Sequence, residues 1–517
     1  MTFQIIYVAC CLVLMIWALI ADRLKPGLIL FTCVVLMLCA GILTPKDCLE
    51  GFSNKGMITV ALLFLVSEGV RRSGILEQIV FSMLPKKKTS VKKANARLLP
   101  VVSLFSAFLN NTPVVVIFAP MVKNWARKFG LPYTKFLIPL SYATILGGVC
   151  TLIGTSTNLV VNGMIQDSGR EGMGMFELGK VGIVATLVGL AYLIFYSHYL
   201  LPEKREGDTE IEKKPDTTTV EVVLRSRFPG LGKSIREFDF FRHYGAHVLS
   251  IRRSGELMTG DWMNMKLLNH DTLILETDFK FVQAYKDSTA FLISSYDTDN
   301  EMLKGRKRWF AFILLAFMIV GATVGELPFM KAWVPGFKFD MFFFVCVTTV
   351  IMAWTGMFNA RKYSKYMSWD VLVTIACAFA ISKGMTNSGF ADSIAGFIIE
   401  VADKIGHSEE GVYGMMAILF LITNLFTELI TNNAAAALSF PLALSVAEKL
   451  ECNPMPFFIC ICMAASAAFC TPIGYQTNLL VQGIGGYKFT DYVKVGLPLN
   501  IIFFLISVFV IPEIWEF

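Results

Sequence analysis

The sequence has few of the residues that build most catalytic and metal centres. It contains only five histidines, and none lies in the middle of a long apolar run. A histidine proton relay inside an apolar core is therefore not supported. The twelve cysteines show no Cys-x-x-Cys spacing, and ten of them lie in apolar runs, where small packing residues are expected rather than metal ligands. No nucleophile–base pair or metal-ligand cluster stands out, so we expect no enzyme.

Charge is also scarce. Charged residues make up 17% of the chain, hydrophobic residues make up 55%, and the mean hydropathy is +0.59. Several apolar runs approach the length that spans a bilayer: 4–21, 27–43, 181–201, 309–325, 342–354 and 497–511. The first run has too little positive charge before it for a cleavable signal peptide, so we interpret it as the first span. The net charge of +6 is mild. We expect a lipid bilayer, the inner (plasma) membrane, as partner and no nucleic acid.

The apolar runs and their interruptions predict the same arrangement twice, in residues 1–201 and 309–517. Each half has three spans, a helical hairpin (94–128 and 412–450), a broken span and a last span, which makes ten spans in all. An odd number of crossings per half inserts the second half upside down relative to the first. We therefore predict an all-α polytopic membrane protein with an inverted-topology repeat, two re-entrant helical hairpins and broken helices.

The distribution of basic residues predicts the orientation of this arrangement. Cytoplasmic loops carry an excess of Lys and Arg. With the N- and C-termini outside, most clustered basic residues fall on the cytoplasmic side: Arg23, Lys25, Arg71, Arg72, Lys86, Lys87, Lys88, Lys92, Lys93, Lys123, Arg127, Lys128, Lys135, Arg306, Lys307, Arg308, Arg361, Lys362 and Lys365. The same orientation places the polar region between the two halves in the cytoplasm.

Two asparagine-rich clusters interrupt the apolar sequence at the predicted hairpin tips. One is Asn110-Asn111-Thr112 and the other is Thr431-Asn432-Asn433. Amides at membrane depth cost several kcal/mol unless they find a partner, and paired polar interruptions in two halves point to the binding site of a transporter. The alternative is that these amides only bridge each hairpin to a neighbouring helix.

The residues after each cluster predict helix starts. Proline is favoured at the first helical position, so we predict that Thr112 caps a helix beginning at Pro113 and that Asn433 caps a helix beginning at Ala434. Two helix N-termini near the membrane midplane would favour an anion, and neither tip contributes a Lys or Arg. The amide and hydroxyl oxygens could bind a hard cation such as Na⁺.

The polar region between the halves predicts a small inserted domain. Residues 202–219 and 291–308 read as linkers, and 220–290 carries short alternating runs that are typical of β-strands. The order Gly230-x-Gly232-x-Ser234, Tyr244-Gly245-Ala246 and Asp271-Thr272-Leu273 resembles the C-terminal ligand-binding domain of TrkA-type potassium-transport regulators, the RCK-C domain. The resemblance implies a cytoplasmic α/β domain at 220–290 that binds a small-molecule regulator. A turn remains the alternative reading of the glycines.

The membrane halves resemble the divalent anion:sodium symporter family of the ion transporter superfamily. That family has Ser-Asn-Thr at each hairpin tip, and this sequence keeps the central asparagine of both tips, Asn111 and Asn432. The resemblance implies two sodium sites that flank one anion site. The residues that match the sodium sites are Ser106, Asn110, Asn111 and Gly154, then Thr427, Thr431, Asn432 and Gly474. The residues that match the anion site are Asn111, Thr112, Thr155, Ser156, Asn432, Asn433, Tyr475 and Gln476.

The resemblance also implies a function, which is sodium-coupled symport of a small divalent anion by an elevator-type mechanism in a homodimer. Dicarboxylate-transporting relatives have proline after the glycine of both broken spans, where this chain has Thr155-Ser156-Thr157 and Tyr475-Gln476-Thr477. That departure and the RCK-C-like insertion favour the sulfate-type branch, so sulfate is the expected substrate and Na⁺ the co-transported ion, with no organic cofactor. Thiosulfate, molybdate and a C4 dicarboxylate stay open.

Two other transport classes compete with this reading. One is an antiporter that exchanges sodium or an oxyanion for protons, in which Glu428 of the second hairpin arm would take part. The other is a gated channel component, which the RCK-C resemblance suggests. The chain lacks a Thr-Val-Gly-Tyr-Gly filter, which weighs against the channel.

Overall fold

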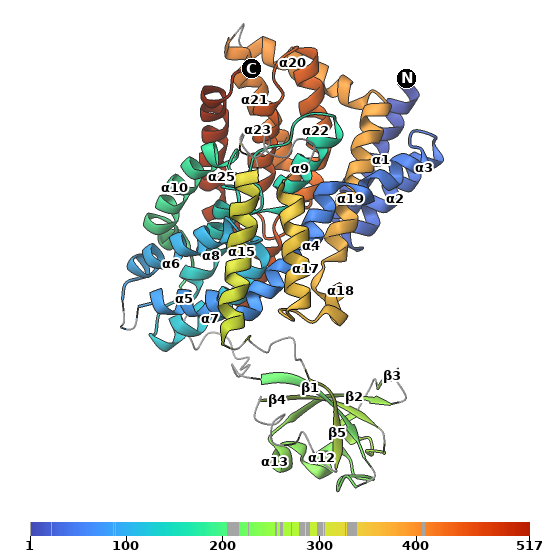
Figure 1. Cartoon of the computed structure of the whole chain (residues 1–517), viewed down its shortest axis with the longest axis vertical. Coiled ribbons are helices and arrows are strands. Elements are labelled where there is room, and N and C mark those ends of the chain that lie inside the picture. Colours follow the sequence, from blue (N-terminus) through green and yellow to red (C-terminus); the bar gives the residue numbers. More distant parts are fainter. Residues whose placement is uncertain are drawn as a thin grey trace. The chain divides into compact units, whose positions relative to one another are not determined.

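The computed structural model divides the chain into two compact units. Residues Met1–Glu206 and Met302–Phe517 form one, which we call the membrane unit, and Gly207–Glu301 form the inserted unit. The structure describes residues 2–21, 23–85, 87, 89–203, 217–225, 227–253, 256–258, 262–269, 271–278, 285, 290–296, 303, 305–325, 327, 339–405 and 409–517. Most of the predicted linker at 202–219 and part of the linker at 291–308 lie outside these residues. Figure 1 shows that the membrane unit is built of helices and that the inserted unit contains the β-strands.

The regular elements described in the first half of the membrane unit are all helices. Its elements are α1 (Thr2–Ile20), α2 (Pro26–Cys39), α3 (Pro45–Glu50), η1 (Gly51–Ser53), α4 (Lys55–Ser73), α5 (Ile75–Met83), α6 (Val91–Ser106), α7 (Asn111–Lys128), α8 (Thr134–Gly148), α9 (Ser156–Asp167), α10 (Gly179–Phe195) and α11 (Ser197–Leu200). Loops between them are short, and several helices start with a side-chain cap, such as Asn54 on α4 and Ser90 on α6.

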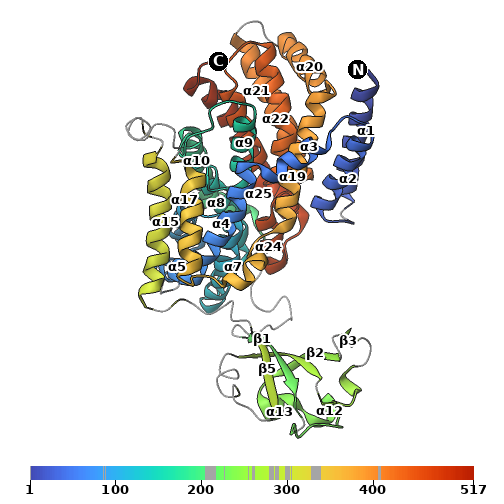
Figure 2. The ribbon, with the colours of Figure 1, turned by 45° about the vertical axis from the view of Figure 1, so that its right-hand side comes forward.

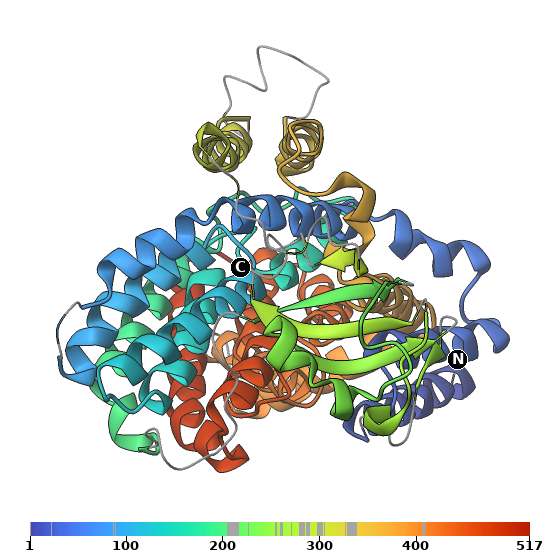
Figure 3. The same ribbon diagram turned by 90° about the horizontal axis from the view of Figure 1, so that it is seen from below.

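The second half repeats this order. Its elements are α15 (Arg306–Gly325), α17 (Met341–Trp354), η4 (Ala360–Lys362), α18 (Tyr363–Tyr366), α19 (Trp369–Asn387), α20 (Phe390–Ile405), α21 (Glu409–Leu429), α22 (Asn432–Lys449), α23 (Met455–Ser466), α24 (Gln476–Gly485) and α25 (Phe489–Ile514). The turned view in Figure 2 shows α15 and α17 side by side, and Figure 3 shows the same pair end-on in yellow and amber.

Six helices in the described part of the chain are long and apolar enough to cross a membrane. They are Phe3–Ile20, Pro45–Ser73, Arg306–Gly325, Trp369–Asn387, Val412–Leu429 and Phe489–Ile514. Four predicted spans or span halves are shorter apolar helices: Pro26–Cys39, Gly179–Phe195, Met341–Trp354 and Met455–Ser466. One of the six, Val412–Leu429, is an arm of a predicted hairpin, because length and hydropathy alone do not separate a re-entrant arm from a span.

Two helical hairpins carry the asparagine clusters at their tips. Helices α6 and α7 form the first and α21 and α22 the second, close to the predicted limits 94–128 and 412–450. The predicted helix starts are wrong. Helix α7 begins at Asn111, and Asn110 caps it by accepting a hydrogen bond from the Thr112 N–H at 3.5 Å. Helix α22 begins at Asn432 after Thr431, so Asn433 is already helical.

The early helix starts have a simple cause. The first-turn N–H groups of a helix need no intrahelical acceptor, so Pro113 fits at the third helical position as well as at the first. In the second hairpin, a run of alanines follows Asn433. Alanine has the highest helix propensity of all residues, so the helix extends to the tip.

Each half contains a broken helix, in which a non-helical stretch separates two helical segments. Residues 149–155 separate α8 from α9, and residues 467–475 separate α23 from α24. The Thr151 hydroxyl accepts from the Gly154 N–H at 3.1 Å and donates to the Ala107 carbonyl of the hairpin. Thr471 repeats both contacts, with Gly474 at 3.1 Å and with a hairpin carbonyl at 3.0 Å. A threonine hydroxyl thus ties each break to its own hairpin tip.

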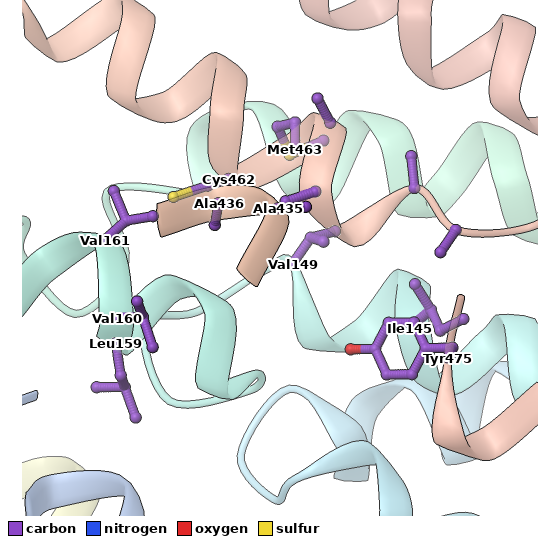
Figure 4. Close-up of a cluster of buried hydrophobic side chains, with 14 of the residues drawn as sticks. Ile145, Val149, Leu159, Val160, Val161, Ala435, Ala436, Cys462, Met463 and Tyr475 are labelled. Carbon is purple, nitrogen blue, oxygen red and sulfur yellow. The ribbon is translucent and has the colours of Figure 1, made fainter. Parts of the chain in front are cut away.

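The second segment of each broken helix packs against the hairpin of the other half. Helix α9 lies against α22 and α23, and α24 lies against α7 and α8. Buried apolar side chains fill this junction. Figure 4 draws Ile145 of the first half beside Tyr475 of the second, and Val149 beside Ala435. The hairpin tips and both breaks therefore meet within one core.

The inserted unit is a five-stranded antiparallel sheet in the order β3-β2-β4-β1-β5. Its described elements are β1 (Thr217–Leu224), α12 (Ile235–Phe238), α13 (Phe240–Tyr244), β2 (His247–Arg253), β3 (Glu256–Leu257), η2 (Trp262–Asn264), β4 (Thr272–Asp278) and β5 (Phe291–Tyr296). A separate apolar core, which includes Val222, Phe238 and Leu273, supports the sheet. Strands β1 and β5 extend beyond the predicted limits of 220–290, and β5 pairs with β1.

The residues that carry the RCK-C resemblance have structural tasks in this unit. Gly232 has φ +80°, a conformation that glycine adopts without strain. Ser234 forms a capping box with Glu237 at the start of α12. The buried Asp271 makes a two-bond ion pair with Arg253, at 2.8 Å for each bond, and this hydrogen bonding raises the pKa of the Arg253 guanidinium. The turn reading of the glycine motif therefore agrees with the backbone.

Candidate functional site

A cavity of about 300 Å³ lies where the two hairpin tips and the two helix breaks meet. Seven of the eight residues predicted to touch an anion line it: Thr112, Thr155, Ser156, Asn432, Asn433, Tyr475 and Gln476. Four of the residues predicted to bind sodium also line it, namely Asn110, Thr431, Gly474 and Asn432, which belongs to both predicted sets. Residues 320 or more positions apart in the sequence are thus brought to one site.

The first half contributes a chain of hydrogen bonds that starts behind the cavity wall. The Ser106 hydroxyl donates to Asn111 Oδ1 at 2.6 Å. Asn111 is only 1% exposed, and its Nδ2 donates to the Tyr475 hydroxyl of the other half at 2.6 Å. The Tyr475 hydroxyl lies 3.1 Å from the Thr155 hydroxyl. Asn111 therefore reaches the site through Tyr475 rather than lining the cavity itself.

The second half repeats the first of these contacts. The Thr427 hydroxyl lies 3.0 Å from Asn432 Oδ1 and 2.6 Å from the Ala465 carbonyl, and its single hydrogen can go to one of them at a time. Beside it, Thr431 Oγ1 is buried with no partner in the described part of the protein. Ser106 and Thr427 thus hold their asparagines in the same way.

The donor sets fit a hard monovalent cation as a transported ion. The predicted sodium residues offer neutral hydroxyl, amide and carbonyl oxygens, which hard cations prefer. A Cβ built on Gly148 would lie 2.8 Å from Asn111 Oδ1 and 3.2 Å from the Gly154 carbonyl oxygen, so both oxygens surround one glycine. Among the described residues there is no group of three or more His, Cys, Asp or Glu that could hold a metal ion.

Four helix N-termini converge on the cavity, twice the number expected from the hairpins. The residues that precede α7, α22, α9 and α24 all line it: Asn110, Thr431, Thr155 and Tyr475. Each N-terminus carries a partial positive charge and unpaired N–H groups. The described lining contains no Lys or Arg, and its ionisable carboxylate is Asp370, which accepts from the Gly27 N–H at 3.3 Å. The site therefore favours an anion through dipoles.

Two residues near the site were not predicted as ligands. Thr157 lines the cavity, and its hydroxyl lies 3.3 Å from Asn433 Oδ1, which also accepts from Ser156 at 3.1 Å. Thr157 directly follows the predicted pair Thr155 and Ser156, so its position after the break could have been used to predict it as a ligand. Asp370 lies more than 200 residues from any predicted site residue of the first half, and only the folded chain brings it there.

Comparison with known proteins gives three findings. A family model described as CitMHS, citrate transporter, matches residues 12–445 and 407–515. An uncharacterized transporter of Synechocystis, sll0640, is 27% identical over 90% of each chain, and sodium/sulfate cotransporter 1 of Chlamydomonas reinhardtii is 22% identical over 95% of this chain and 88% of its own. The crystal structure of the Alcanivorax borkumensis YdaH transporter superposes with a TM-score of 0.52 at 12% identity, over 90% of this chain and 87% of that one.

Proposed function

The chain belongs to the citrate transporter family, within the ion transporter superfamily, and on this premise we propose that it is a sodium-coupled symporter of a small divalent anion, with sulfate as substrate. It is a multi-pass membrane transporter and not an enzyme. The observation that carries the proposal is the convergence of four helix N-termini on a cavity without basic residues. Such a site attracts a dianion but leaves its charge to be balanced by bound cations.

Sodium is the proposed balancing cation. Each half offers a hydroxyl that holds an asparagine amide, Ser106 with Asn111 and Thr427 with Asn432. The Gly154 carbonyl oxygen and Asn111 Oδ1 both lie next to Gly148, and Gly474 lies next to the Thr427 carbonyl oxygen, so backbone carbonyls could complete each set. A relative of this chain carries sodium and sulfate in its name, which supports this choice of ions.

Sulfate is favoured over larger anions by the dimensions of the cavity. Its volume of about 300 Å³ is at the lower end of ligand pockets, which run from about 300 to about 1,000 Å³. The Tyr475 ring fills the position that a small threonine, Thr155, occupies in the first half. Tyr475 is also nine-tenths buried and held by Asn111, so it reduces the room for a second carboxylate.

The transport movement we propose is of the elevator type in a homodimer. The hairpins and broken helices pack on one another across the halves, which supports their movement as one body. The repeated order of elements supports an inverted repeat, with both termini outside and the inserted unit in the cytoplasm. The cavity is also lined by Leu19, Pro26 and Asp370, which lie next to the predicted cytoplasmic loops. With this orientation, the cavity lies next to cytoplasmic loops, and the conformation of the structure corresponds to an inward-open state.

The inserted unit is proposed to regulate transport as an RCK-C-type domain. The support is the order of its motif residues and the fact that all cavity-lining residues belong to the membrane unit. A cytoplasmic small molecule that binds this unit would change the rate of transport and leave the choice of anion unchanged.

Uptake into proteoliposomes tests the proposal. We expect labelled sulfate to accumulate under an inward sodium gradient, with little accumulation when potassium replaces sodium. Labelled succinate and citrate should accumulate far less than sulfate. Equal uptake of sulfate with and without the sodium gradient would disprove the coupling, and preferential uptake of succinate or citrate would disprove the substrate.

A further inference from the structure

Helices α4 and α19 carry the same sequence pattern, one in each half of the membrane unit. At one constant spacing along the chain, the two helices have identical residues at several positions. These are Thr59, Phe64, Ser67 and Gly69 in α4, and Thr374, Phe379, Ser382 and Gly384 in α19. The two helices therefore correspond residue by residue, as expected for an internal repeat.

The packing partners of these two helices correspond in the same way. Helix α4 packs against α17, and α19 packs against α2. A Cβ built on Gly69 would lie 2.8 Å from Met352 Sδ, and one built on Gly384 would lie 2.8 Å from Met37 Sδ. The two methionines stand at the same spacing along the chain as the two glycines. The correspondence found in the sequence is therefore also that of the folded helices.

The charges at the starts of these helices are reversed between the halves. Lys55 is the first residue of α4, and its counterpart in the first turn of α19 is Asp370. The residues that precede the partner helices are reversed as well, because Asp340 caps α17 where Lys25 precedes α2. Lys55 with Asp340 and Asp370 with Lys25 are therefore equivalent pairs in which the two charges have changed places.

Only one of these two pairs is joined in the structure. Lys55 Nζ forms an ion pair with Asp340. No ion pair joins Asp370 to Lys25 among the described residues, and Asp370 accepts a hydrogen bond from the Gly27 N–H at 3.3 Å instead. Asp370 lines the cavity, whereas Lys55, Asp340 and the exposed Lys25 do not. The cavity therefore lies beside the open pair, and the closed pair is away from it.

We propose that Lys55 and Asp370 line the anion cavity in turn, Asp370 when the cavity opens to the cytoplasm and Lys55 when it opens to the outside. The inference rests on the proposed function. Alternating access in an inverted repeat moves one repeat against the other around the site, so each half takes the place of its counterpart. The Lys55–Asp340 pair then opens as the Asp370–Lys25 pair closes.

The reversed charges give the two conformations different affinities for the same anion. An anion that enters from outside meets the Lys55 ammonium, which can make a charge-assisted hydrogen bond to it. On the cytoplasmic side the anion faces the Asp370 carboxylate, which repels it and favours its release. The sodium gradient still supplies the driving force. Lys55 is thus proposed as an anion-binding residue of the outward-open conformation, in which it adds the basic group that the described cavity lacks.

Charged thiol reagents test this proposal without any substrate. Thr59 and Thr374 are buried one turn after Lys55 and Asp370, and the Thr59 hydroxyl donates to the Lys55 carbonyl at 2.7 Å. The full-length variants Thr59→Cys and Thr374→Cys are treated with an anionic and a cationic methanethiosulfonate, in right-side-out and inside-out vesicles respectively. Mass spectrometry follows the one introduced cysteine, and each rate is divided by the rate of that reagent with free cysteine.

We expect Thr59→Cys to react from outside several-fold faster with the anionic reagent, and Thr374→Cys to react from the cytoplasm several-fold faster with the cationic one. Adding Lys55→Gln to the first variant and Asp370→Asn to the second should abolish these preferences. Failure of Thr59→Cys to react from outside would overturn the proposal. The same preference with and without Lys55 would also overturn it.

Sulfate uptake separates binding by Lys55 from a purely structural ion pair. Lys55→Gln should raise the KM for external sulfate by about tenfold and change the maximal rate by less than about twofold. Asp340→Asn removes the same ion pair but keeps the lysine, so its KM should stay unchanged or fall. The double variant Lys55→Asp with Asp340→Lys restores an ion pair and should keep the raised KM.

An equal rise in KM for Lys55→Gln and Asp340→Asn would show that only the ion pair matters, and would contradict the inference. A wild-type KM in the charge-swapped double variant would contradict it as well. Absence of sulfate uptake by the wild-type protein would contradict only the proposed substrate, and the reagent rates would still decide the role of Lys55.

Discussion

The two halves of the membrane unit share their hydrogen-bonding framework and differ in the side chains that the framework presents. In both, a hydroxyl holds the tip asparagine, Ser106 with Asn111 and Thr427 with Asn432. In both, a second asparagine fixes the break, with Asn158 Nδ2 at 3.0 Å and Asn478 Nδ2 at 3.2 Å from a threonine carbonyl. These contacts satisfy backbone groups that a broken helix leaves without partners in an apolar environment.

The differences lie in single side chains at equivalent positions of the two halves. Thr155 faces Tyr475 across the junction, and Ala107 corresponds to Glu428. We infer that the duplicated contacts hold the hairpins and ions, whereas the unequal position of Thr155 and Tyr475 sets the size of the substrate. Five experiments test this division.

The largest effect is expected from removing either tip asparagine. Asn111→Ala and Asn432→Ala should each reduce sodium-driven uptake by about 100-fold or more, because each loses the amide that connects a tip to the cavity. Asn95→Ala is a matched control, since Asn95 is buried in α6 and donates to the Lys135 carbonyl at 3.1 Å, away from the tip. The control should lose stability but keep sodium dependence. Full uptake by a tip variant would remove the basis of the site.

Labelling tests whether the halves are inverted. Lys128 at the end of α7 and Lys449 at the end of α22 are both exposed. Single cysteines at these positions, with Cys10 and Cys39 replaced by serine, should be labelled from the cytoplasm and from outside respectively. A membrane-impermeant maleimide on right-side-out and inside-out vesicles gives the measurement. Labelling of both positions from one side would contradict the inverted repeat.

Making the two breaks alike should alter selectivity. Tyr475→Thr gives the second half the residue of the first and opens room in the cavity. We expect the ratio of sulfate to succinate uptake to fall by about tenfold. Tyr475→Phe keeps the ring, loses the hydroxyl that bonds to Asn111 and Thr155, and should keep the wild-type ratio. If Tyr475→Thr keeps that ratio as well, the ring does not limit substrate size.

The break glycines should differ in their tolerance of a side chain. A Cβ at Gly154 would lie 2.5 Å from the Gly148 carbonyl oxygen, and one at Gly474 would lie 2.8 Å from the Thr427 carbonyl oxygen. Both alanine variants should lose about 1–3 kcal/mol, with Gly154→Ala the worse. Gly483 is helical and has nothing within 4 Å of its added Cβ, so Gly483→Ala should be neutral or stabilised by about 1 kcal/mol. Thermal unfolding in detergent measures the stability of all three variants. Equal melting temperatures for the three would refute the close approach of a carbonyl oxygen to Gly154 and Gly474.

The smallest effect on selectivity is expected from removing the inserted unit. Replacing Gly207–Glu301 with a Gly/Ser linker removes the whole sheet, whereas cutting at 220–290 would leave β5 without its partner β1. Sodium dependence and the sulfate-to-succinate ratio should stay unchanged while the maximal rate or its regulation changes. A change in the anion carried would show that the unit takes part in selection.

The sequence by itself determined the hairpins, the breaks and most of the polar residues of the cavity wall. Polar residues such as Asn111 and Asn432 are conspicuous within apolar runs, because burying an amide without a partner is costly. The duplicated spacing from tip to break was equally visible in the linear chain. For these reasons seven of the eight predicted anion-site residues line one cavity.

Only the tertiary structure decided the features that depend on distances between remote residues. Asn111 and Tyr475 are 364 positions apart, and their hydrogen bond exists because α24 crosses to the hairpin of the other half. The convergence of four helix N-termini has the same origin. Local composition specifies where a helix can break, but packing of the two halves decides what each broken end faces.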